Sequence, residues 1–426
     1  MDHLPASFFI KSRSKLQELM LPGSVVVIAS NRKMHRNGDQ HFPFRQSSDL
    51  YYLSGIREEM TVLVIWRGSY SDQYKEILYL PEEDPVKTRW EGPQISQEDA
   101  GANSGIIDVR VHTTLLKDLR ELFENSSHVY FGTPRPGDDP ESISNEAEIR
   151  RSLENETARL QEHLISPLMT RIRMFKEYEE VEMIRRAIEA TGKAFIQSLS
   201  IMQPGVREYE IAAGIISEIY KSGCNDLAFE PIIASGQNAL ILHYTGSRGI
   251  CEKGSMVLMD FGADWEYYAG DISRTIPVNG KFTKRQLELY NACHRVLNKA
   301  MKLMVPGKLM QDFHAEVGAL FEEEHIKLGL YSMQDARDNR GKTPLWKEYY
   351  WHGTSHSIGL DVHDPFDHEM KFAPGMVLSC EPGLYCKEEG IGIRLENDML
   401  ITANGAENLS AGIPIDPAEI EELMHR

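Results

Sequence analysis

The sequence predicts a mixed α/β protein of two domains, the second of which contains two similar halves. Strand-like and helical segments alternate over about the first 165 residues, and a long amphipathic helix follows them. The helix-ending pattern Met202-Gln203-Pro204-Gly205 then has a counterpart about a hundred residues later, at Met304-Val305-Pro306-Gly307. We therefore expect one domain over residues 1–168 and a second over residues 169–426.

The first domain is expected to be a compact α/β unit. Apolar and β-branched runs predict strands, and apolar residues spaced three and four apart predict helices. The expected strands are Ser24–Ser30, Thr61–Arg67, Glu76–Leu80 and His128–Phe131, and the expected helices cover Ser14–Leu21 and Leu115–Asn125. Thr133–Pro140 is rich in Pro, Gly and Asp, which predicts a loop, and a polar helix is expected from there to about His163.

The second domain is expected to open with a helix whose apolar face runs from Val181 to Leu199. A helix at Glu208–Lys221 comes next. A third starts after Thr283, where Gln286 completes a capping box, and a fourth covers Phe313–Leu328. Each pair of helices leads to a pair of strand-like segments, so a site between the two halves would draw residues from both.

Composition excludes several classes of function. The chain has 46 basic and 64 acidic residues, a net charge of −18, so nucleic acid and acidic membrane surfaces are poor partners. Its apolar runs are far shorter than the roughly 20 residues of a membrane-spanning helix, and the start lacks the pattern of a secretory signal. Five cysteines without a CxxC pair indicate neither a disulfide framework nor a thiolate zinc site. We expect a cytoplasmic protein.

Two strand pairs carry carboxylates. Residues 254–262 and 269–277 predict a hairpin, and a turn at Asp264–Tyr267 would place Asp260 directly across from Asp271. Facing residues have Cβ atoms about 4.5–5.5 Å apart, so two carboxylates placed this way repel unless a cation lies between them. In the second half, Val377–Tyr385 and Gly392–Ile401 would pair and place Glu381 opposite Glu396.

A single Asp or His is more often a structural residue than a ligand, but four acids in two similarly registered hairpins favour a divalent-cation site. Two such cations could be held by four acids and one imidazole. The segment from His352 to Asp364 contains three histidines and offers several candidates for that imidazole.

These residues resemble the M24 metallopeptidases of the pita-bread fold, and among them the Xaa-Pro aminopeptidases (aminopeptidase P). The catalytic-domain motifs that carry the resemblance are Leu242-His243-Tyr244, Met259-Asp260-Phe261-Gly262, Tyr268–Thr275, His352–Asp364, Glu381–Tyr385 and Ile393–Asp398. In the first domain, Phe42–Gly55 is similar to the signature of the N-terminal domain that such aminopeptidases carry. The resemblance covers nearly the whole chain.

The resemblance implies a two-metal centre with the ligands Asp260, Asp271, His356, Glu381 and Glu396. Manganese suits this oxygen-rich set, although cobalt, iron and zinc are alternatives. Glu381 would shuttle protons, while His243, His352 and His363 would contact the substrate and the developing oxyanion. Tyr385 would line the substrate site, although packing is its stronger interpretation. For Arg394 two roles stay open, in catalysis or in neutralising the four acids.

The resemblance also implies the substrate, a peptide with proline in second position that is cut before that proline. Prolidase activity on Xaa-Pro dipeptides is the nearest alternative, and a non-catalytic binding module is a third. Relatives form dimers or tetramers, so a homo-oligomer is expected. Segment Leu330–Lys347 is interpreted either as a surface loop or as an intersubunit contact.

Overall fold

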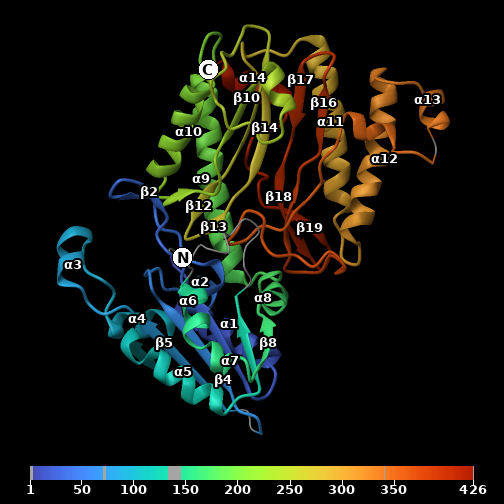
Figure 1. Ribbon diagram of the computed structural model, residues 1–426. Coiled ribbons are helices and arrows are strands. Elements are labelled where there is room, and N and C mark those ends of the chain that lie inside the picture. Colours follow the sequence, from blue (N-terminus) through green and yellow to red (C-terminus); the bar gives the residue numbers. More distant parts are fainter. Residues whose placement is uncertain (1–2, 71–72, 133–144, 340, 426) are drawn as a thin grey trace. The chain divides into compact units, whose positions relative to one another are not determined.

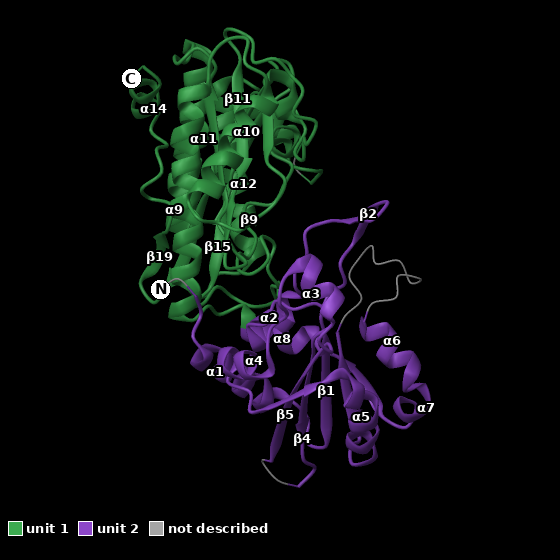
Figure 2. Ribbon diagram, turned by 90° about the vertical axis from the view of Figure 1, so that its left-hand side faces the viewer, with its two compact units in different colours: residues 1, 173–426 green, residues 2–172 purple. Residues whose placement is uncertain are grey.

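The structure is a computed structural model and describes residues 3–70, 73–132, 145–339 and 341–425 (Figure 1). The chain divides into two compact units, one ending at Ile172 and the other running from Arg173 to Arg426 (Figure 2). The sequence-based division after residue 168 falls inside helix α8 (Ser166–Arg173), at this junction. The expected loop at Thr133–Pro140 lies outside the described residues.

The N-terminal unit contains a six-stranded mixed sheet with the order β6-β5-β4-β1-β7-β8. Strand β1 is buried along its whole length, pairs antiparallel with β4 and parallel with β7, and forms the middle of the core. This is the position expected for the continuous apolar run Ser24–Ala29. The strands are β1 (Ser24–Ala29), β4 (Val62–Arg67), β5 (Tyr74–Leu80), β6 (Asp108–Val111), β7 (His128–Phe131) and β8 (Gln161–Leu164).

The four predicted strands of this unit are confirmed, as is helix α5 (Leu115–Glu124). Helix α1 (Ala6–Leu19) overlaps the helix expected at Ser14–Leu21 but begins eight residues earlier. The polar helix expected up to His163 is wrong at its end. Helices α6 (Asn145–Ser152) and α7 (Glu154–Thr157) stop early, and Gln161–Leu164 forms β8 beside β7. This polar edge strand is specified by its partner strand and not by its own composition. The prediction missed β6, β8, the hairpin β2 (His35–Asn37) and β3 (Gln40–His41), and helices α2 (Ser48–Ser54), α3 (Pro85–Glu91) and α4 (Gln97–Ser104).

The C-terminal unit has its four predicted helices. In Figure 1, α9 and α10 lie on one side of the strands, and α11 and α12 lie on the other. The expected capping box is present, because the Thr283 amide donates to Gln286 Oε1 at 2.9 Å and the Gln286 amide donates back to Thr283 Oγ1 at 3.3 Å. The helices are α9 (Tyr178–Ile201), α10 (Glu208–Lys221), α11 (Lys284–Leu303) and α12 (Met310–Leu328).

Between these helices lie small sheets with the orders β10-β11-β14, β13-β12-β9, β15-β18-β19 and β16-β17. The strands of the first half are β9 (Asp226–Leu227), β10 (Ile232–Ser235), β11 (Met256–Phe261), β12 (Ala263–Trp265), β13 (Tyr268–Ala269) and β14 (Ile272–Pro277). Those of the second half are β15 (Val377–Cys380), β16 (Gly383–Cys386), β17 (Ile391–Arg394), β18 (Asn397–Thr402) and β19 (Gly405–Asn408).

The register expected for the first hairpin is wrong by two residues. Asp260 pairs with Ser273 and not with Asp271, because the turn contains only Glu266 and Tyr267, with φ of 55° and 70°. Positive φ at both turn residues is typical of the tight two-residue hairpin. Side chains alternate between faces with a period of two, so this slip leaves Asp260 and Asp271 on the same face, as diagonal neighbours.

The second hairpin has the expected register. The ladder β15–β18 ends at Cys380 opposite Asn397, and β16–β17 resumes the same register at Gly383 opposite Arg394. Glu381 and Glu396 therefore face each other at the break between the two ladders.

Segment Leu330–Lys347 contains the short helix α13 (Met333–Asp338) and the start of a 3₁₀ turn, η3 (Leu345–Glu348). The last helix is α14 (Pro417–Met424). Within the described ranges, every helix is too short or too polar to cross a bilayer.

Candidate metal centre

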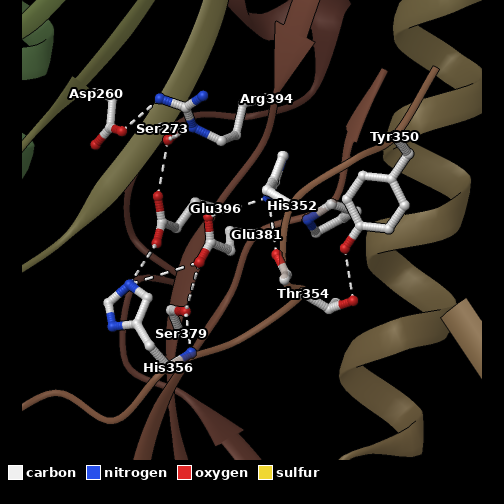
Figure 3. Close-up of polar contacts among 12 residues, drawn as sticks. Asp260, Ser273, Tyr350, His352, Thr354, His356, Ser379, Glu381, Arg394 and Glu396 are labelled. Carbon is white, nitrogen blue, oxygen red and sulfur yellow. Dashed lines mark hydrogen bonds and ion pairs between the residues drawn. The ribbon is translucent and has the colours of Figure 1, made fainter. Parts of the chain in front are cut away.

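One imidazole faces acids of both hairpins: His356 lies beside Glu381 and Glu396 of the second hairpin (Figure 3) and Asp271 of the first. His356 Nε2 lies 3.5 Å from Asp271 Oδ2, 3.6 Å from Glu381 Oε1 and 3.9 Å from Glu396 Oε1. Asp271, His356 and Glu396 each offer a ligand atom, and these three atoms lie within 4.8 Å of one another. The structure thus selects His356 from the three histidines of the 352–364 segment as the one facing the acids.

Unsatisfied oxygens lie at the centre of this cluster. Asp260 Oδ1, Asp271 Oδ1 and Glu396 Oε1 are buried without a hydrogen-bond partner among the described residues. Asp271 is 4% exposed and Glu396 is 2% exposed. Leaving buried carboxylate oxygens unpaired is costly, and hard divalent cations prefer oxygen ligands. The donor set therefore fits a metal site.

The electrostatics agree with that fit. Burial, followed by the charge of Asp260, raises the pKa of Asp271 well above its ordinary value. Burial, followed by the charge of Asp271, raises the pKa of Glu396 well above its ordinary value, and burial raises the pKa of Glu381. Burial opposes the imidazolium of His356, but the Glu381 and Glu396 charges outweigh it and raise its pKa. A cation among the acids would remove this repulsion and allow all of them to ionise.

Arg394 connects the two halves. Its Nη2 donates to Asp260 Oδ2, its Nε to Ser273 Oγ at 2.9 Å and its Nη1 to Tyr385 Oη at 3.0 Å. The guanidinium is buried, and its donors are directed at protein groups of the cluster. Of the two roles that the sequence left open, this geometry favours neutralising and orienting the acids.

His352 is held in one tautomer. Its Nδ1 lies 2.8 Å from the Gly353 carbonyl, which can only accept, so Nδ1 carries the proton and Nε2 accepts from Tyr385 Oη at 2.8 Å. Burial, and then the charge of Arg394, lower the pKa of His352 to about 3, so the ring is neutral. Nδ1 also lies 3.7 Å from Glu381 Oε2.

His363 and His243 are the exposed histidines of the site. The His363 ring lies 4.2 Å from that of His356, between centroids, and burial followed by the His356 charge lowers the pKa of His363 to about 4. His243 contributes to the lowered pKa of both His352 and His363, which places it near the same centre. Tyr385 has the expected packing role, because its buried ring lies 4.8 Å from that of Trp351 and its hydroxyl is satisfied locally.

Sequence reasoning missed several residues of the site. The Thr354 carbonyl accepts a hydrogen bond from the Glu381 amide at 2.9 Å. Thr354 Oγ1 forms a hydrogen bond with the buried Tyr350 hydroxyl (Figure 3). Asp398 is fully buried and accepts the Asp271 amide at 3.0 Å, and burial raises the pKa of Asp398 to about 7. Its position two residues after Glu396 in the predicted strand Gly392–Ile401 was the available signal, because alternation puts both residues on one face.

Comparisons with known proteins define the class. A model of metallopeptidase family M24 matches residues 182–403, and a model of the aminopeptidase P N-terminal domain matches residues 9–130. These matches give a metallopeptidase of the pita-bread fold, preceded by an α/β domain of the aminopeptidase P type, as the resemblance implied.

Full-length relatives narrow this class. The chain is 32% identical to an Xaa-Pro aminopeptidase of Escherichia coli, over 100% of this chain and 99% of the relative, and 28% identical to human Xaa-Pro aminopeptidase 3 over 93% and 80%. E. coli aminopeptidase P, solved with the inhibitor Pro-Leu, superposes with a TM-score of 0.89 at 31% identity and covers 99% of both chains. The protein therefore belongs to the aminopeptidase P branch of metallopeptidase family M24.

Proposed function

We propose that this chain hydrolyses the bond between an N-terminal residue and a following proline in a peptide, with two divalent cations held by Asp260, Asp271, His356, Glu381 and Glu396. The observation that carries the proposal is the convergence of both hairpins' acids on His356, with three buried carboxylate oxygens lacking a partner. The names of the full-length relatives support the proline specificity.

When bound, the cations would supply Lewis acidity that activates water and stabilises the oxyanion of the tetrahedral intermediate. Glu381 is the proposed proton carrier. It is the most exposed of the three acids facing His356, and its backbone amide is fixed by the Thr354 carbonyl. It would accept a proton from the attacking water and pass it to the proline nitrogen that leaves.

The histidines divide between two tasks. Neutral His352 directs its only N–H to the Gly353 carbonyl and accepts from Tyr385, so it does not hydrogen-bond Glu381, and we assign it to lining the site beside that carboxylate. His243 and His363 are exposed, and the His363 ring lies 4.2 Å from that of His356, so we assign both to contacting the peptide and donating to its carbonyl oxygen. Arg394 and Tyr385 would hold Asp260 and His352 in these positions.

The finer properties follow the same reasoning. Manganese is our proposed metal, because four carboxylates and one imidazole form an oxygen-rich donor set. The cytoplasm is our proposed compartment, since all five cysteines are buried free thiols. A homo-oligomer, as a dimer or a tetramer, is the proposed assembly.

The test compares hydrolysis of an Xaa-Pro-Xaa tripeptide with that of the matching Xaa-Pro dipeptide. Chelator-stripped protein is assayed with and without manganese, and then with cobalt and zinc. Metal-dependent release of the first residue from the tripeptide, with little cleavage of the dipeptide, is expected. Preference for the dipeptide would make the protein a prolidase, and no activity on either peptide with any metal would favour a binding module.

A further inference from the structure

A buried carboxylate outside the metal centre, that of Glu208, accepts five hydrogen bonds. Glu208, in the first turn of α10, is 0% exposed. Its Oε1 accepts from the Ser235 amide at 2.7 Å, Ser235 Oγ at 2.7 Å and Asn238 Nδ2 at 2.8 Å. Its Oε2 accepts from Tyr244 Oη at 2.9 Å and the Gly249 amide at 2.6 Å. All five donors are uncharged and lie 27 to 41 residues after Glu208 in the chain.

These contacts span one segment, residues 235–249, which we name the His243 loop. Glu208 holds its first residue through Ser235, its last through Gly249 and its middle through Tyr244. Tyr244 Oη also accepts from Asn238 Nδ2 at 3.1 Å, which ties the two inner contacts together. The loop thus encircles a single carboxylate, and His243 precedes Tyr244 directly.

An ordinary helix cap does not explain this arrangement. A capping side chain accepts from amides of its own first turn, whereas Glu208 accepts nothing from α10 in these five bonds. Burial acts to raise the pKa of Glu208, but the hydrogen bonds from Asn238, Ser235 and Gly249 outweigh it and lower the pKa. An ionised acid of this kind stabilises the conformation of whatever supplies its donors.

We propose that Glu208 is a positioning residue that fixes the His243 loop, and through it places His243 for peptide binding. The inference rests on the proposed peptidase function for its effect on substrate. Glutamine at this position would turn an NH₂ group toward backbone and hydroxyl donors, whichever way the amide is oriented. In either orientation at least one backbone N–H of the loop, that of Ser235 or that of Gly249, would face the NH₂ group and lose its acceptor, without a change in side-chain size.

The kinetic experiment is a double-mutant cycle with Glu208→Gln and His243→Ala, assayed on an Xaa-Pro-Xaa tripeptide. We expect Glu208→Gln to raise KM about 10- to 100-fold with unchanged metal content. In the His243→Ala background the same substitution should cost almost nothing, because its effect passes through His243. Full additivity of the two losses would overturn the proposal.

Two further variants separate positioning from general damage. Tyr244→Phe removes one donor and is expected to raise KM about fivefold. Glu324→Gln is the matched control, because Glu324 is a buried acid on α12 whose partners are Arg295 and Lys327. Wild-type KM is expected for Glu324→Gln, and a KM rise equal to that of Glu208→Gln would contradict a specific role.

Hydrogen exchange provides a readout that does not depend on activity. In Glu208→Gln, the amides of the His243 loop, above all those of Ser235 and Gly249, should exchange faster while α9 and α11 stay protected. Unchanged exchange in the loop would overturn the proposal. An inactive wild type with faster loop exchange in the variant would instead remove the proposed function and leave the loop-holding role in place.

Discussion

The two carboxylate hairpins share one layout but fill it differently. In the first, Asp260 pairs with Ser273, and the same register places Gly262 opposite Asp271 just beyond the end of the ladder. In the second, Ser379 pairs with Asp398, and the same register places Glu381 opposite Glu396 just beyond the end of the ladder. The acid and the serine have exchanged strands, and a glycine stands where the second half has Glu381. The halves therefore supply equivalent positions but not equivalent ligands.

This difference sets what each half can contribute. The first hairpin places its two acids diagonally, with Arg394 on Asp260. The second places two glutamates face to face, both within 4 Å of the His356 imidazole, whereas Asp271 is the acid of the first hairpin that faces this ring, at 3.5 Å. We infer that the glutamate half carries the proton chemistry, whereas the aspartate half mainly holds charge.

The largest effects are expected from Asp271→Asn and Glu396→Gln. Each variant removes one charge from a buried member of the cluster, one in each half, so both should lose bound metal and at least 10³-fold in kcat/KM. Metal analysis and tripeptide hydrolysis check this. Full metal content and activity in either variant would show that its hairpin does not supply an essential metal ligand.

His363→Ala should have the next largest effect. His363 is exposed and belongs to neither hairpin, so metal content should stay near that of the wild type while kcat falls about 10²-fold or more. Steady-state kinetics with parallel metal analysis measure both. Loss of metal in this variant would move His363 into the ligand set.

The two serines give a matched pair of smaller effects. Ser273 Oγ donates to Glu396 at 2.7 Å and accepts from Arg394, whereas Ser379 Oγ donates to Glu381 at a longer 3.3 Å. Ser273→Ala should weaken metal affinity about 10-fold, and Ser379→Ala should weaken it less. Isothermal titration with manganese measures the metal affinity of both variants. A larger loss of affinity in Ser379→Ala than in Ser273→Ala would contradict the order expected from the two hydrogen-bond lengths.

The smallest expected effect is on the pH dependence of stability. Acids whose pKa is raised on folding bind more protons when folded, so their contribution to stability is full below the unfolded pKa and is lost as pH rises through the folded pKa. Asp271, Glu381 and Glu396 all shift in this direction. Metal-free protein should therefore lose this contribution toward pH 8, and added manganese should raise Tm by several degrees more at pH 8 than at pH 5. An equal rise at both pH values would contradict the shifts.

The sequence predicted the faces of both hairpins because alternation with period two is a local property. It did not predict the register of the first, since two positive-φ residues, Glu266 and Tyr267, shorten the turn and neither is glycine. The four long helices of the C-terminal unit were likewise predictable from periodicity and capping. Strand β8 was not, because its pairing with β7 decides it.

Contacts between distant segments account for the rest of what sequence reasoning missed. No residue near Glu208 in the sequence indicates that its carboxylate accepts hydrogen bonds from both Ser235 and Gly249. Likewise, no residue near Thr354 indicates that its carbonyl accepts the Glu381 amide. The alternation of side chains along a strand could have predicted that Asp398 faces the site. Its hydrogen bond from the Asp271 amide could not be predicted, because only the fold brings the two hairpins together.

The central claim is that both hairpins together form one two-metal centre, and counting the bound ions tests it most directly. Chelator-stripped protein should be titrated with manganese, and the ions retained per chain should be measured by mass spectrometry beside tripeptide hydrolysis. We expect about two ions per chain, with activity appearing as the site fills. A fully active chain that retains no ion would contradict it.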